Sequence, residues 1–78
     1  IESLNQERNY EIVCPFEKHE LNHYESLFKQ YKLKVMHSSQ RKVEQQISGR
    51  WVLMGSAKNH QKLTLHLLND QNIQELSF

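Results

Sequence analysis

The segment from His19 to His23 is a literal H-E-x-x-H motif. On a helix, its two histidines lie one turn apart and can share a zinc ion, while Glu20 can act as the general base, as in metalloproteases. The surrounding helical pattern, however, has its apolar stripe on Leu21, Tyr24, Phe28 and Tyr31, and both histidines point away from that stripe. We therefore predict two solvated histidines and no resident metal, with a surface zinc site through His19 and His23 as the alternative.

Other catalytic chemistry has few candidates in the sequence. His37, His60 and His66 are isolated, so no third metal ligand follows the motif at a recognisable spacing. Cys14 is the only cysteine, which excludes an internal disulfide, and it has no evident base partner. Two glycines six residues apart make no phosphate-binding loop. We expect no enzyme, no catalytic residue and no cofactor.

The charge of the chain argues against nucleic acid as a partner. The formal net charge is +1, and the nearest basic cluster is Lys29, Lys32 and Lys34, which we interpret as a solvated face. Tyr10 and Trp51 could imitate the stacking pair of an RNA-recognition sheet, but the basic, glycine and aromatic residues of that motif are missing around Trp51. We expect no nucleic-acid binding, and a place for Trp51 in the core or in an interface.

The spacing of apolar residues along the chain indicates the helices and strands that position these residues. Strand patterns alternate with helical ones in the order strand, helix, strand, strand, helix, strand. The segments are residues 10–14, 17–32, 33–35, 50–57, 59–70 and 72–78, with Glu17 and Glu20 in the first turn of the first helix. This order predicts an α+β, ferredoxin-like βαββαβ fold, with a four-stranded antiparallel sheet and two helices on one face.

The length of 78 residues allows one domain with a modest core. We predict that residues 1–9 are a linker or tail from a longer parent protein, because the chain begins with Ile1, and that residues 10–78 are the domain. Between Leu33 and Ala57, a turn near Ser38–Arg41 competes with one at Ser48-Gly49. We prefer the second turn, because glycine adopts positive φ without steric cost.

Two parts of the chain resemble a known family. The run Asn9-Tyr10-Glu11-Ile12-Val13-Cys14-Pro15, followed by an acid-rich helix, resembles the opening of the soluble C-terminal domain of MgtC/SapB proteins. The leucine-rich segment 63–68 and the segment 73–78, which closes in Phe78, match the end of that domain, and residues 1–4 resemble the connector from its last membrane helix. The resemblance implies an ACT-like module on the cytoplasmic side of a membrane protein linked to magnesium homeostasis. It implies no catalytic residue.

We therefore expect a non-catalytic regulatory or interaction domain that pairs with a second copy or with its parent protein. Contact with a membrane would come only through a segment preceding Ile1. Trp51, Met54 and Phe78 are the predicted interface residues, because large apolar groups on an open sheet favour association. A small-ligand sensor of the ACT kind is the alternative function, although no glycine lies near Pro15-Phe16, where such sensors carry one.

Overall fold

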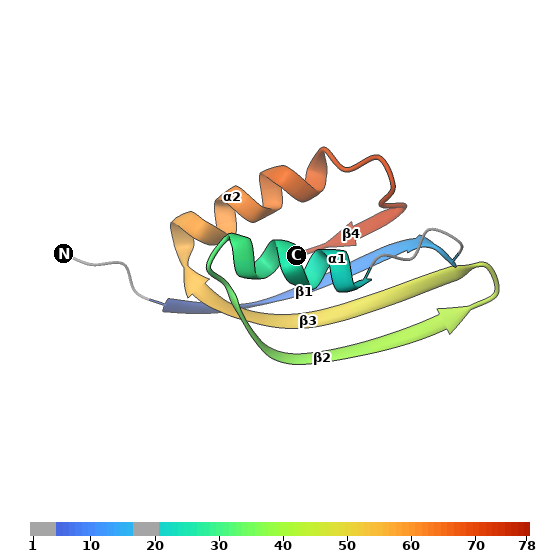
Figure 1. The fold of residues 1–78 in the computed structure, drawn as a ribbon, viewed down its shortest axis with the longest axis horizontal. Helices are drawn as coiled ribbons and strands as arrows, with labels where there is room; N and C mark the ends of the chain where they lie inside the picture. The colour runs from blue at the N-terminus through green and yellow to red at the C-terminus, as the bar shows by residue number, and fades with distance from the viewer. Residues whose placement is uncertain (1–4, 17–20) are drawn as a thin grey trace.

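The computed structural model describes residues 5–16 and 21–78. Figure 1 shows both helices on the same side of the sheet. The elements are β1 (Asn5–Pro15), α1 (Leu21–Gln30), β2 (Lys34–Val43), β3 (Gln46–Ser56), α2 (Ala57–Leu68) and β4 (Glu75–Ser77). The predicted βαββαβ order and the four-stranded antiparallel sheet are confirmed.

The strands lie in the order β2-β3-β1-β4, so β1 and β3 are central and β2 and β4 are the edges. The β1–β3 ladder runs without a break from Asn5 opposite Ser56 to Pro15 opposite Gln46. β4 pairs only with residues 11–13 of β1. The long central ladder therefore sets the register of the whole sheet.

The core lies between the central strands and the two helices. On α1, the predicted apolar stripe is buried at Leu21, Tyr24 and Phe28, and Leu27 completes it, whereas Tyr31 is only half-buried. From α2, residues 60, 63 and 67 are buried one turn apart on the same face. The helical period of both segments thus explains why each helix packs on the sheet along a single stripe.

The first strand begins earlier than predicted. Residues 5–9, which we expected to be linker or tail, form the first half of β1, while residues 1–4 lie outside the described part of the chain. Their polar side chains are mostly exposed, and it is their backbone pairing with the end of β3 that makes them a strand. A strand exposed on both faces carries no hydrophobic alternation, so the sequence pattern does not reveal it.

The hairpin also turns elsewhere. β2 and β3 are joined by Glu44 and Gln45, and Glu44 has the positive φ, at 55°, that we assigned to a glycine. Gly49 instead lies within β3, without positive φ. A Cβ on Gly49 would come within 2.4 Å of the Trp51 ring, so close packing explains this glycine.

The second helix and the last strand differ in their bounds. α2 begins at Ala57, because the side chain of Ser56 accepts a hydrogen bond from the Asn59 backbone amide at 3.1 Å. Asn59, the predicted N-cap, is inside the helix. β4 covers only three of the seven residues that we predicted, because the carboxylate of Asp70 turns the chain by accepting from the Asn72 backbone amide.

Candidate functional site on the open face and edge of the sheet

The face of the sheet opposite the helices carries polar side chains in register. The even-numbered residues 10–14 of β1 belong to the core, so the residues between them point to the open face. One row crosses that face from edge to edge: Ser77 of β4, Glu11 of β1, Arg50 of β3 and Ser39 of β2 are direct neighbours.

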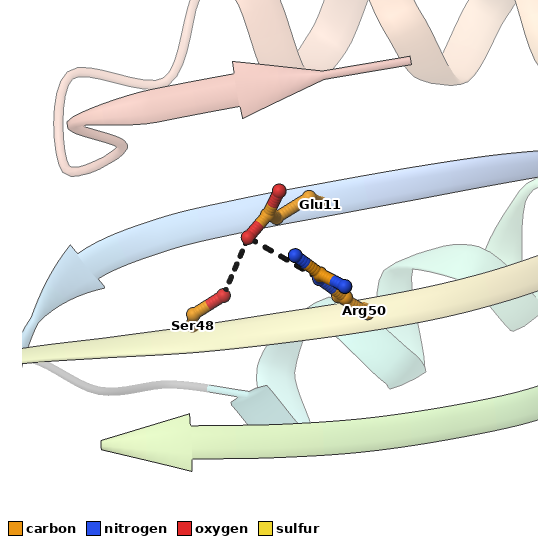
Figure 2. A network of polar contacts seen from close by, with 3 residues as sticks. All are labelled: Glu11, Ser48 and Arg50. Carbon is orange, nitrogen blue, oxygen red and sulfur yellow. Dashed lines mark hydrogen bonds and ion pairs between the residues drawn. The ribbon is translucent and has the colours of Figure 1, made fainter. Parts of the chain in front are cut away.

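Glu11 fixes the central part of this row. Its Oε2 accepts a hydrogen bond from the Ser48 hydroxyl at 2.9 Å and lies 3.4 Å from Nε of Arg50 (Figure 2). The Arg50 side chain is 69% exposed, whereas that of Glu11 is 32% exposed. The contact with Glu11 uses one of the five N–H donors of the guanidinium group, and the side chain that carries them is mostly exposed to solvent.

Two hollows flank the Glu11–Arg50 pair. The large hollow, of about 590 Å³, receives residues from all four strands. Its polar and apolar lining includes Asn9, Glu11, His37, Ser39, Arg50 and Val52. The small hollow, of about 130 Å³, is lined by Glu11, Ser39, Gln40, Arg41, Ser48 and Arg50. Hydroxyl, imidazole and guanidinium donors that line shallow hollows can bind a small polar ligand.

β2 is exposed along its entire length, on both faces and at its outer edge. All ten of its residues are exposed, and it is an edge strand with β3 as its one neighbour in the sheet. A bulge at Met36 interrupts its pairing with β3, and the segment from His37 to Val43 is then regular. An exposed, regular edge strand presents unpaired backbone N–H and C=O groups that a further strand can use.

Trp51, a predicted interface residue, lies in the core with only 2% of its surface exposed. Its Nε1 donates a hydrogen bond to Glu25 of α1 at 2.9 Å, and its ring meets the Phe28 ring edge-to-face at a centroid distance of 5.0 Å. Trp51 cannot be the residue that a partner covers. Met54 is half-buried on the open face, and Phe78 is 64% exposed beside the Tyr10 ring, so these two remain predicted interface residues.

A buried polar pair joins β1 to α2. The hydroxyl of Tyr10 lies 2.6 Å from Nδ1 of His60, and Nε2 of His60 lies 2.9 Å from the Gln6 carbonyl oxygen. A carbonyl only accepts, so Nε2 carries the proton, and Nδ1 accepts from Tyr10. Burial lowers the pKa of His60, since the charged form is poorly solvated there. The hydrogen bond to the Gln6 carbonyl raises this pKa, and the positive charge of Arg8 lowers it, but burial has the largest effect. Burial likewise raises the pKa of Tyr10.

The remaining histidines give no metal site among the described residues. His19 lies outside them, so its proposed pairing with His23 is untested, and His23 itself is exposed with its ring edge on Tyr24. No group of three or more potential ligands occurs in residues 5–16 and 21–78. His37 is exposed on β2, and His66 is exposed on α2 beside the hydroxyl of Tyr31.

Sequence reasoning expected an open face and at least one exposed edge, but it missed the Glu11–Arg50 pair. The signal was present, because Glu11 falls between apolar residues of an alternating strand and therefore had to face away from the core. Its pairing with Arg50, however, depends on the register between strands far apart in the sequence. Tyr10 and Trp51 both point into the core, so the aromatic pair of the RNA reading is not on the open face.

Comparison with known proteins establishes the class of fold. No family model matches the chain, and no curated protein is significantly similar to it. Among solved structures, the ACT domain of the GTP pyrophosphokinase of Chlorobium tepidum superposes with a TM-score of 0.73 over 94% of this chain and 84% of that one, at 8% sequence identity. The chain therefore has an ACT-like, ferredoxin-like fold, and this likeness concerns the fold alone.

Neither helix in the described residues is both long and apolar enough to cross a membrane.

Proposed function

We propose that this chain is a non-catalytic regulatory module that acts by contact, pairing with a second copy of itself through the edge of β2. The observation that carries the proposal is the exposure of all ten β2 residues. Two such edges in antiparallel contact satisfy each other's backbone groups and extend the sheet across both copies. The pairing would also supplement a core that is small for an independent domain.

The sequence of β2 favours one register for this pairing. A two-fold axis perpendicular to the sheet opposes residues of the same face, and the midpoint of the regular segment from His37 to Val43 is Gln40. With the axis at Gln40, Arg41 faces Ser39 of the second copy, and Lys42 faces Ser38. No cation then lies directly opposite another. An axis through Arg41 would oppose that residue to itself, which is unfavourable.

Charge substitutions test this arrangement. In the double variant Ser38→Lys and Gln40→Lys, three pairs of cations face each other across the axis, because Ser38 lies opposite Lys42. At about 0.2–1 kcal/mol for each pair, dimerisation weakens by roughly threefold to one-hundredfold. The matched control, Ser26→Lys and Gln45→Lys, adds the same charges at exposed positions on α1 and in the turn. Sedimentation velocity from micromolar to millimolar concentration measures the dimerisation constant of each double variant and of the wild type.

Two results would contradict different parts of the proposal, namely the contact through β2 and self-association as such. Equal weakening by both double variants would move the contact away from β2. A wild-type chain that stays monomeric at millimolar concentration would remove self-association altogether.

We further propose that the parent is an MgtC/SapB-type membrane protein linked to magnesium homeostasis, with this domain at its cytoplasmic face. The resemblance supports this: its Tyr-led segment lies in β1 and its leucine-rich segment in α2. An antibody raised against the domain should detect the native protein in membranes, where it should resist extraction by alkaline carbonate. Recovery of the native protein in the carbonate extract would contradict the assignment.

A small-ligand sensor is the second candidate, favoured by the large hollow with its oriented Arg50. Titration of the labelled chain with a panel of amino acids tests it. Saturable amide shifts at Asn9, His37 and Val52 would support a sensor, and the absence of shifts at 10 mM would argue against it.

A further inference from the structure

We infer that pairing at β2 completes a binding site for a multiply charged anion, built from four arginines around the two-fold axis. This inference rests on the proposed self-association and adds to it a ligand class and a means of control. Each copy supplies Arg41 and Arg50, and neither copy holds the whole site.

The half-site is visible in a single chain. Arg50 faces Ser39, and Arg41 faces Ser48, so the two arginines are diagonal neighbours on the open face, about 7–8 Å apart at their Cα atoms. Both line the small hollow. Among the described residues, Glu11 is the one acidic residue lining that hollow, and it contacts Arg50 at Nε, while the Arg50 side chain stays 69% exposed.

The dimer register brings the two halves together. With the axis at Gln40, Arg41 of one copy lies diagonal to Arg41 of the other, again about 7–8 Å away. The four guanidinium groups then form a continuous zigzag from Arg50 to Arg41 and across the axis to the second copy. Two Glu11 carboxylates, one at each end, leave the centre positively charged.

This arrangement selects the chemistry of the ligand. A guanidinium group presents parallel N–H donors that match phosphate and carboxylate oxygens. Four of them in a row fit an elongated anion with several charged groups, such as a chain of linked phosphates, better than a single small anion. Without that anion the arginines repel each other across the axis, so the bound anion would favour the dimer.

Inorganic tripolyphosphate is a suitable probe, with sodium chloride at the same ionic strength as the reference. Dimerisation constants come from sedimentation velocity on the complete chain. In the wild type, we expect tripolyphosphate at ten times its Kd for the dimer to raise the dimerisation constant by about tenfold. Arg41→Gln should lose this rise, because it removes both central arginines of the site. The matched control is Arg8→Gln on β1, whose side chain bonds Gln6 away from the axis.

The Arg41→Gln variant has a second signature that a damaged fold would not give. In sodium chloride alone it should dimerise more tightly than the wild type, because the repulsion is gone, while in tripolyphosphate it should dimerise more weakly. Equal wild-type constants in the two salts would overturn the anion site and leave β2 pairing intact. A rise that persists in Arg41→Gln would also overturn it. A wild type that is monomeric in both salts at millimolar concentration would overturn the proposed function, and this inference with it.

Discussion

Replacing Gly49 with alanine should destabilise the domain through a single collision with Trp51. The new Cβ would lie 2.4, 2.8 and 3.0 Å from three carbons of the indole ring, whereas carbon atoms normally pack about 3.5–4.0 Å apart. The ring would have to move by about 1 Å. It has little room, because its other contacts are an edge-to-face packing on Phe28 and a hydrogen bond to Glu25.

The magnitude follows from two opposing terms. Overpacking of a filled core costs about 1–3 kcal/mol, while replacing glycine by alanine returns about 0.4–1 kcal/mol by restricting the unfolded chain. The net loss is about 1–2 kcal/mol. In a domain of this size that corresponds to a fall of roughly 5–15 °C in Tm.

The assay is thermal and urea unfolding of Gly49→Ala, followed by circular dichroism and by the fluorescence of Trp51, the only tryptophan in the chain. A double-mutant cycle with Trp51→Leu isolates the collision. In the Trp51→Leu background, Gly49→Ala should cost almost nothing or stabilise slightly. The same loss in both backgrounds would refute the packing explanation.

Three further predictions concern the core and the histidines. Leu21→Ala and Phe28→Ala should each destabilise by about 2–5 kcal/mol in urea unfolding, and wild-type midpoints for both would mean that α1 packs with another face. Because burial lowers the pKa of His60 in the folded chain, the unfolded chain binds its proton first as the pH falls below about 6.5. Stability should therefore fall between that pH and the lower folded pKa, by at most about 1.4 kcal/mol per pH unit, and His60→Gln should flatten this slope in urea midpoints measured from pH 7.5 to 5. His23→Ala should change the free energy of unfolding by less than about 0.5 kcal/mol, so a larger loss by thermal melting would reveal a role that its exposed position does not suggest.

The order of helices and strands was predictable because, in each element that faces the core, apolar residues repeat with the spacing typical of a helix or of a strand. Leu21, Tyr24 and Phe28 follow the helical repeat, and Tyr10 with Ile12 follows the strand repeat, so local sequence determines which side is buried. The polar half of β1 and the turn at Glu44 have no hydrophobic repeat that would indicate their structure. They are held by pairing with β3, which is a property of the assembled sheet.

The candidate site was harder to predict for the same reason. In β3, residues 51–54 are all apolar, so alternation alone does not say whether Trp51 or Met54 faces the helices. The side chain of Trp51 points to the helices, on the same face of β3 as Gly49. Gly49 has no side chain there, and the indole ring lies across it. The Glu11–Arg50 contact requires the β1–β3 register, which no local pattern contains.

The central position of β1 has a consequence for how the chain is made. Of the six elements, β1 leaves the ribosome first, whereas its neighbours in the sheet, β3 and β4, follow in the second half of the domain. Until then its apolar end, Ile12 to Cys14, has no sheet partner, whereas the β2–β3 hairpin closes locally through a two-residue turn. The hairpin should therefore form first and receive β1 afterwards, a late, long-range step that slows folding. Nascent chains that stop before β3 should be the species most prone to aggregate.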